Sequence, residues 1–177
     1  MKNNDEILLD SKYFSVVKRR DSYGLTMKIV SVAVLPYTVN SYGLPVELGI
    51  LFEHNEFRPG KAETLITGSI DPSDPDVLTT AKRELLEEGG FEAPEDDRWI
   101  FLGNLYTDKS MDRAYPTFAV NVTGLKQGEA KGDGSYMEEN SKLIMSDISK
   151  GITSDEMLTL AAYVRLMNYF YQKTQNK

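Results

Sequence analysis

The sequence has 177 residues, no cysteine and a single histidine, His54. The absence of cysteine excludes disulfides, thiol nucleophiles and cysteine-based zinc sites, and one histidine is too few for a dedicated zinc site. Cations are also scarce, because 20 Lys and Arg stand against 27 Asp and Glu, for a net charge of -7. A surface of that sign repels nucleic-acid phosphates, so no nucleic-acid partner is expected. A small phosphorylated ligand held through a metal ion is not excluded.

Long hydrophobic runs are missing as well. The most apolar stretches, residues 29–37 and 157–171, are shorter than the roughly 20 residues that a membrane-spanning helix needs, and the second contains Arg165. The first residues lack the basic and then apolar order of a signal peptide. The sequence therefore predicts a cytoplasmic protein with no membrane partner.

Apolar residues make up 41% of the chain, which is enough for one core at this length. We therefore expect one domain, residues 1–177, with strands interleaved with helices in a mixed α/β arrangement. Glycines among polar residues predict a mobile loop over residues 126–140. Apolar and β-branched runs predict strands at residues 12–19 (followed by a turn at Tyr23-Gly24), 27–37, 46–52, 62–67, 99–107, 116–123 and 142–145.

Two helices are predicted from capping signals. Asp74 followed by Pro75 is a favourable pair for the start of a helix, and Gly89-Gly90 would end it. Apolar residues at helical spacing predict a final helix over residues 154–172.

The first of these helices carries acids where they are unfavourable. Glu87 and Glu88 lie three and four residues after Glu84, and all three occupy the helix end at which the dipole favours cations. Arg83 can pair with Glu87 but cannot neutralise three acids. Most acidic runs are solvated faces, and that interpretation stays open. The alternative is a site for a hard divalent cation such as Mg²⁺, which binds to few carboxylates together with water and substrate phosphates.

Residues 83–91, Arg-Glu-Leu-Leu-Glu-Glu-Gly-Gly-Phe, resemble the second half of the Nudix box, REUxEExGU, at every fixed position. Residues 68–74 resemble its first half, a glycine followed by five residues and an acid. Two departures are present: Asp74 stands where glutamate is usual, and eight residues instead of seven separate it from Arg83.

Two looser similarities indicate the branch of ADP-ribose and nucleoside-diphosphate-sugar pyrophosphatases. They are Phe-Arg-Pro-Gly at residues 57–60 and Tyr-Met-Glu-Glu-Asn at residues 136–140. The resemblance implies a Nudix-type α/β/α sandwich with a mixed β-sheet and a catalytic helix over about residues 76–88. It also implies a homodimer in which an N-terminal strand extension, residues 1–25, takes part in the dimer contact.

The activity implied is hydrolysis of the pyrophosphate bond of a nucleoside diphosphate linked to another group, such as ADP-ribose or a nucleotide sugar. The cofactor would be Mg²⁺, with Mn²⁺ as a substitute. By resemblance, the metal ligands would be Glu87 and Glu88, completed by Glu84 and by the carbonyl of Gly68. Arg83 would orient the glutamates from outside the ligand shell.

The resemblance also implies a general base on a late loop. Glu139 matches this position best, Glu138 is one residue away, and both could equally be solvated loop acids. Arg58 would contact a substrate phosphate, since a guanidinium suits bidentate contacts, and Arg113 is a weaker candidate of the same kind. The departures at Asp74 leave a second interpretation open, a catalytically silent Nudix-fold module that senses nucleotides.

Overall fold

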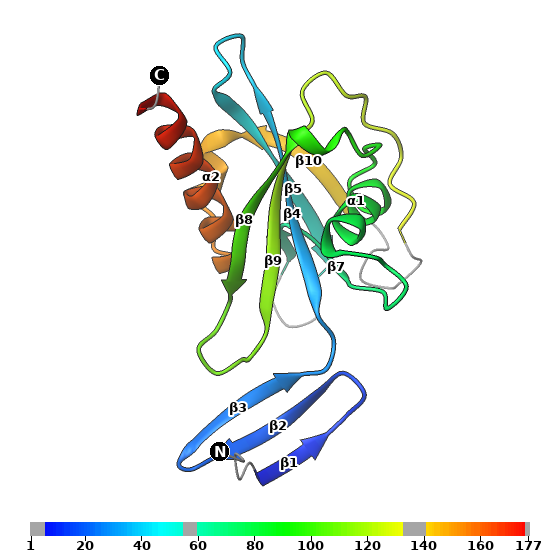
Figure 1. Cartoon of the computed structure of the whole chain (residues 1–177), viewed down its shortest axis with the longest axis vertical. Coiled ribbons are helices and arrows are strands. Elements are labelled where there is room, and N and C mark those ends of the chain that lie inside the picture. The colour runs from blue at the N-terminus through cyan, green and yellow to red at the C-terminus, as the bar shows by residue number, and fades with distance from the viewer. Residues whose placement is uncertain (1–5, 55–59, 133–140, 176–177) are drawn as a thin grey trace.

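A mixed seven-stranded sheet, here the main sheet, forms the centre of the protein (Figure 1). The computed structural model describes residues 6–54, 60–132 and 141–175. The strand order is β10-β5-β4-β9-β8, with β6 paired to β5 and β7 paired to β4. Only the β4–β9 pair is parallel among the described pairs, which confirms the expected mixed sheet. The strands are β4 (Ser31–Val39), β5 (Pro45–His54), β6 (Lys61–Thr64), β7 (Ile66–Ser69), β8 (Trp99–Tyr106), β9 (Ala114–Asn121) and β10 (Lys142–Asp147).

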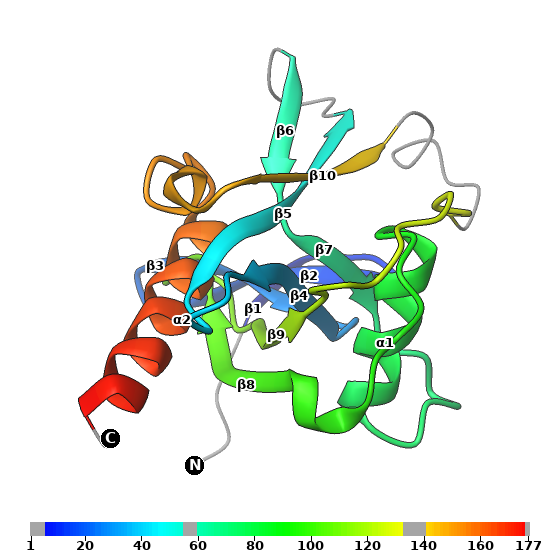
Figure 2. The same ribbon diagram turned by 90° about the horizontal axis from the view of Figure 1, so that it is seen from above.

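Two α-helices cover opposite faces of the main sheet, α1 (Val77–Glu87) and α2 (Met157–Gln175), as Figure 2 shows from above. Short 3-10 helices occur at η1 (Asp96–Arg98) and η2 (Ile148–Gly151). Successive side chains of a strand point to opposite faces, so β4 contributes to both cores. The core under α1 contains Val32, Val34, Leu51, Ile66, Ala81 and Leu85. The core under α2 contains Ala33, Leu35, Leu48, Ile50, Leu158, Ala162 and Leu166.

A second sheet, here the N-terminal sheet, projects from one end of this sandwich (Figure 1). It consists of β1 (Glu6–Asp10), β2 (Phe14–Arg19) and β3 (Ser22–Met27) in an antiparallel meander. Residues 28–30 connect it to β4. It also contacts the β8–β9 connection, where the Leu25 N–H donates to the Ser110 carbonyl (2.8 Å) and the Asp112 N–H donates to the Leu25 carbonyl (3.1 Å).

The expected turn at Tyr23-Gly24 is wrong, because both residues lie inside β3. The chain turns instead at Arg20-Asp21, with Arg20 in a left-handed conformation (φ 57°). Gly24 is instead required by a close contact between two segments. A Cβ atom there would lie 2.7 Å from the Ser110 carbonyl oxygen, so glycine allows the N-terminal sheet to approach the β8–β9 connection.

The helix boundaries also differ from the predicted ones. Asp76, not Asp74, is the N-cap of α1: its Oδ1 accepts from the Thr79 N–H (2.8 Å) and from the Thr79 hydroxyl (3.0 Å). These bonds lower the pKa of the Asp76 carboxyl. The helix therefore begins two residues after Pro75, and α2 begins and ends about three residues later than predicted. Within the described residues, neither helix combines the length and the hydropathy that a membrane-spanning segment requires.

Two strand predictions are corrected in the main sheet. The strand predicted over residues 27–37 begins at Ser31 and continues past Pro36 to Val39. The missing N–H of Pro36 is tolerated because β4 changes its antiparallel partner there, from β7 at residues 31–34 to β5 at residues 37–39. The predicted strand at residues 62–67 is two strands, β6 and β7, separated at the buried Leu65.

Replacement of Leu85 by alanine should destabilise the protein by about 2–5 kcal/mol, because Leu85 is fully buried between α1 and the main sheet. Urea unfolding followed by Trp99 fluorescence measures the change. Leu86→Ala is the matched control, since Leu86 is the next residue on the helix and is 36% exposed. Equal losses for the two variants would contradict the packing of α1 described above.

Candidate active site

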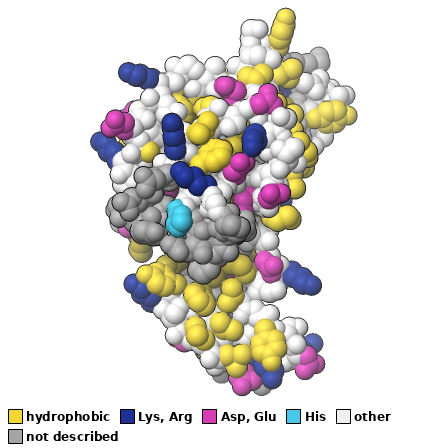
Figure 3. All heavy atoms as spheres, turned by 180° about the vertical axis from the view of Figure 1, so that it is seen from behind, with side chains coloured by type: hydrophobic (Ala, Val, Ile, Leu, Met, Phe, Trp, Pro, Cys, Tyr) yellow, Lys and Arg dark blue, Asp and Glu magenta, His cyan; other side chains and the backbone are white. Residues whose placement is uncertain are grey.

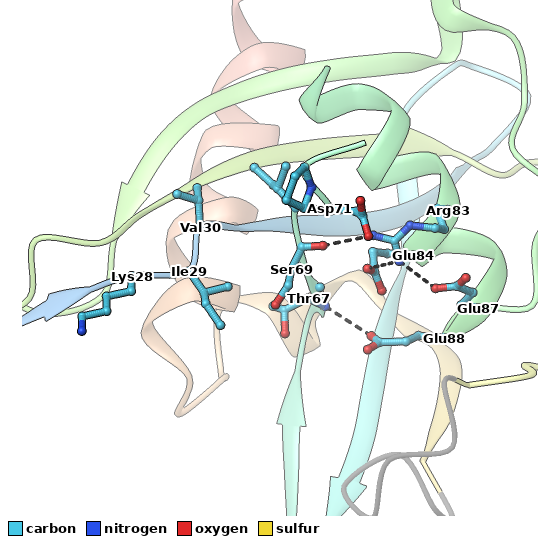
Figure 4. Close-up of a pocket in the computed structure, with 13 residues that line it drawn as sticks. Lys28, Ile29, Val30, Thr67, Ser69, Asp71, Arg83, Glu84, Glu87 and Glu88 are labelled. Atoms are coloured by element: carbon cyan, nitrogen blue, oxygen red, sulfur yellow. Dashed lines mark hydrogen bonds and ion pairs between the residues drawn. The ribbon is translucent and has the colours of Figure 1, made fainter. Parts of the chain in front are cut away.

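A cleft of about 880 Å³ opens beside α1 and β7. Figure 4 shows one wall formed by carboxylates of α1, facing β7 and the chain at residues 28–30. The aliphatic side chains of the cleft belong to Ile29, Val30, Ile70 and Pro72, and none of the described lining residues is aromatic. The full lining is Lys28, Ile29, Val30, Thr67, Gly68, Ser69, Ile70, Asp71, Pro72, Arg83, Glu84, Glu87 and Glu88.

The acids of α1 do not form a solvated face. Glu84 and Glu88 are each only 6% exposed, and the Glu87 side chain is about one third exposed. The Thr67 N–H donates to Glu88 Oε2 (3.2 Å), which ties the end of the helix to β7. Charged groups are costly to bury, so these carboxylates require compensation by nearby donors and cations.

Arg83 supplies part of that compensation. Its Nη1 lies 2.7 Å from Glu84 Oε1 and 2.9 Å from Glu87 Oε2, so one nitrogen bridges two carboxylates. Its Nη2 donates to the Ser69 carbonyl (3.0 Å). Partial burial acts to lower the pKa of Arg83, but the attraction of Glu84 and the hydrogen bond to Glu87 outweigh it, and the pKa is raised. Arg83 thus makes the contacts that an orienting role needs.

Asp74, the residue that departs from the usual glutamate, also contacts Arg83. Its Oδ2 accepts from Thr80 Oγ1 (2.7 Å) and lies 3.5 Å from Arg83 Nη2. The Asp74 side chain is 12% exposed and Thr80 is fully buried. Aspartate is one methylene shorter than glutamate, yet across the longer connection to α1 its carboxylate still reaches Arg83. Asp74 therefore contacts Arg83 in this chain despite its shorter side chain.

Gly68 lies directly against Glu84. A Cβ atom at this position would come 1.8 Å from Glu84 Cδ and 1.9 Å from Glu84 Oε1, so any other residue would have to displace this carboxylate. The strand pairing of Gly68 with Val32 fixes β7 against β4 at the same place. The structure thus brings Gly68 together with the acids of α1, although they are separated by the loop of residues 70–76.

The donor chemistry of this cluster suits a hard cation, because its side-chain ligands would all be carboxylate oxygens. Within the described residues, however, no three Asp, Glu or His side chains lie close enough together to hold a metal ion. Glu84 and Glu87 are turned toward Arg83 Nη1, and Glu88 is turned toward Thr67. Metal binding at these glutamates stays a prediction.

Arg113 is not brought to this cleft. Its Nη2 donates to Ser31 Oγ, and its guanidinium lies 4.4 Å from the centre of the Tyr115 ring. Side-chain alternation in β4 puts Ser31 on the same face as Ala33, which packs under α2, whereas the cleft is on the side of α1. The predicted substrate contact of Arg113 has no support from the cleft.

Other predicted residues lie outside the described part of the chain. These are Arg58 and the two candidates for the base, Glu138 and Glu139. Their roles stay predictions.

No sequence pattern predicted the wall made by residues 28–30. Lys28 forms an ion pair with Asp10 (2.6 Å) and donates to the Ser11 carbonyl (2.6 Å), both in the N-terminal sheet and its first turn. The Ile70 N–H donates to the Val30 carbonyl (2.9 Å). The connection between the two sheets is therefore also part of the cleft, which only the tertiary arrangement shows.

Comparison with known proteins gives a match at the level of structure. No protein-family model matches the sequence, and no curated protein matches it. A solved structure titled as a crystal structure of ADP compounds hydrolase superposes with a TM-score of 0.68 over 96% of this chain and 93% of that chain, at 18% sequence identity. The chain has a Nudix-type fold. At this identity the likeness extends to the fold alone, and it confirms the expected α/β/α sandwich.

Replacement of Gly68 by alanine should destabilise the protein by about 1–3 kcal/mol, because the added methyl group must displace the buried Glu84 carboxylate. The free energy of unfolding in urea measures this. Ser69→Ala is the control, since Ser69 is exposed and only its backbone carbonyl binds Arg83. A Gly68 variant as stable as the Ser69 variant would show that Glu84 does not lie against Gly68.

Proposed function

We propose that this protein is a Mg²⁺-dependent Nudix hydrolase that cleaves the pyrophosphate bond of a nucleoside diphosphate linked to another group. The observation that carries the proposal is the cluster of Glu84, Glu87 and Glu88 on one wall of a cleft, with Arg83 bridging two of them. These are the fixed charged positions of the Nudix box that the sequence resembles. A chain that buries two carboxylates beside a cleft gains no stability from doing so, which favours a functional reason.

ADP-ribose or a nucleotide sugar is the proposed substrate. Two observations support it: the similarity of residues 57–60 and 136–140 to the pyrophosphatase branch, and the structural neighbour, which is named as an ADP compounds hydrolase. With ADP-ribose, water would add to one phosphorus and the bridging P–O bond would break. The products would be AMP and ribose 5-phosphate.

The proposed metal ligands are Glu84, Glu87 and Glu88, together with the Gly68 carbonyl. Bound Mg²⁺ would supply neutralisation of phosphate charge and a more acidic bound water, and Mn²⁺ is the proposed substitute. Arg83 would hold Glu84 and Glu87 in register with each other through its single bridging nitrogen.

The negative charge of the cleft indicates a second role for the proposed divalent cation, in substrate binding. Lys28 and Arg83 are the two cations among the described lining residues, against four acids, Asp71, Glu84, Glu87 and Glu88. A negatively charged diphosphate would therefore be repelled by the negatively charged wall of the cleft. We therefore propose that substrate affinity, like turnover, depends on the divalent cation.

A homodimer formed through the N-terminal sheet is also proposed. This sheet projects from the sandwich and exposes large apolar side chains, and Figure 3 shows hydrophobic groups gathered over this lower part of the molecule. Exposed apolar patches of this kind mark protein contacts, and an isolated three-stranded sheet has little core of its own. The exposed apolar residues are Ile7, Leu8, Leu9, Tyr13 and Tyr23.

Glu88→Gln should lower turnover by at least about 100-fold, because a metal ligand supplies several kcal/mol of transition-state stabilisation. Glutamine retains an oxygen that can accept from the Thr67 N–H, so the fold should be kept. The measurement is a panel of nucleoside diphosphate derivatives with Mg²⁺, with AMP and the second product resolved by chromatography. Circular dichroism checks the fold.

Glu92→Gln is the control, because Glu92 is exposed and follows the same helix. Undiminished turnover by the Glu88 variant would contradict the assignment of the metal ligands. Binding of a nucleotide by the unaltered protein without turnover of any compound would support the silent sensing module instead.

Leu9→Lys should convert the dimer to a monomer, because it places a charge among the exposed apolar residues of the N-terminal sheet. Light scattering after size-exclusion chromatography measures the mass. Val164→Lys serves as the control, since Val164 is a half-exposed apolar residue on α2, away from the N-terminal sheet. A monomeric unaltered protein, or a Leu9 variant that remains a dimer, would contradict this arrangement.

A further inference from the structure

The segment of residues 126–132 lies against the C-terminal end of α1, as Figures 1 and 2 both show. The Gly128 N–H donates to the Gly90 carbonyl (2.7 Å), and the Gly132 N–H donates to the Glu87 carbonyl (3.0 Å). The sequence predicted a mobile loop here. The described part of it is instead hydrogen-bonded to the helix that carries the acid cluster.

These hydrogen bonds pair carbonyl groups at the C-terminal end of α1. The last carbonyls of an α-helix have no partner within the helix. At this end Gly89 and Gly90 are buried, so water does not replace the missing donors. Gly90 has a left-handed conformation (φ 70°), and a Cβ atom on it would lie 2.5 Å from the Gly128 carbonyl oxygen, so glycine is required for both reasons.

Gln127 is the one side chain of this segment that bonds to the helix end among the described contacts. Its Nε2 donates to the Gly89 carbonyl (3.0 Å) and to the Leu143 carbonyl in β10 (3.2 Å). An amide nitrogen has two hydrogens, and both are used. The Gly89 and Leu143 carbonyl oxygens can pair only with a hydrogen-bond donor. The carboxylate of a glutamate, which has the same shape as glutamine, would therefore be repelled by both oxygens.

We propose that Gln127 is a positioning residue for the metal site, an inference that rests on the proposed function. Gly89 follows Glu88 directly, and the Glu87 carbonyl is bonded to the same segment. Gln127 thereby fixes the helix end that carries two of the three carboxylates relative to β10. Loss of its two bonds lets this end shift, so metal affinity and turnover fall together while substrate affinity at saturating metal stays nearly constant.

The test compares Gln127→Glu and Gln127→Ala with Lys126→Ala. Lys126 is the adjacent residue, is exposed, and makes no side-chain hydrogen bond or ion pair within the described structure. Mn²⁺ binding to the protein alone is measured by electron paramagnetic resonance, kcat and KM are measured for ADP-ribose with saturating Mg²⁺, and thermal midpoints are recorded. Gln127→Glu should weaken Mn²⁺ binding by about tenfold or more, as loss of a group that supports metal ligands does. Gln127→Ala should have a smaller effect, and Lys126→Ala none.

Mn²⁺ binding by both Gln127 variants as tight as by Lys126→Ala would overturn the inference, whatever the thermal midpoints. A lower midpoint with unchanged Mn²⁺ affinity would identify a purely structural role and overturn it as well. If the unaltered protein binds Mn²⁺ but hydrolyses no compound of the panel, the proposed function fails, and the Mn²⁺ affinities still decide the role of Gln127. Absence of Mn²⁺ binding to the unaltered protein would overturn both proposals.

Discussion

The contact of Arg83 with two buried or half-buried carboxylates is the interaction on which the site depends. Glu84 and Glu87 lie on the same side of α1 and repel each other, and one guanidinium nitrogen placed between them offsets that repulsion. Arg83 is held in turn by the Ser69 carbonyl and by Asp74, so β7 and the loop before α1 both orient it. A lysine would keep the charge but lose the fork that reaches these separate acceptors.

Close contact between α1 and β7 makes this arrangement possible. The Glu84 carboxylate rests on Gly68, and the Thr67 N–H reaches Glu88 at the other end of the cluster. Ala81 and Leu85 bury the adjoining side of the helix against the main sheet, so the helix cannot rotate to expose its acids without losing its core. The hydrophobic stripe of α1 thus sets the direction in which its charges face.

The cleft is also linked to the N-terminal sheet. Lys28 lines the cleft while its ammonium group is bound to Asp10 and to the Ser11 carbonyl. Whatever holds the N-terminal sheet in place therefore also holds one wall of the cleft. The exposed apolar residues of that sheet have little internal support, and this observation is the basis of the proposed dimer.

The sequence by itself determined the elements whose signals are local. The helix of the acid cluster follows from the spacing of Val77, Ala81 and Leu85 and from the glycines at its end, and the mixed α/β class follows from alternating strand and helix patterns. The resemblance to the Nudix box added the arrangement of the sandwich. The sequence predictions were wrong where one residue type suits two local structures. Asp74 and Asp76 are both good N-caps, and Gly24 suits a turn as well as a close approach of two segments.

Only the tertiary structure decided which polar groups meet. The sequence made Arg113 a weaker candidate for a substrate contact, and its contacts with Ser31 and Tyr115 place it on the other face of the main sheet. No sequence motif singles out Gln127. Its proposed role follows only from the tertiary structure, in which β10 and the end of α1 come together beside it. Hydrogen bonds between segments far apart in sequence depend on position to within a few tenths of an ångström, and no local propensity encodes that.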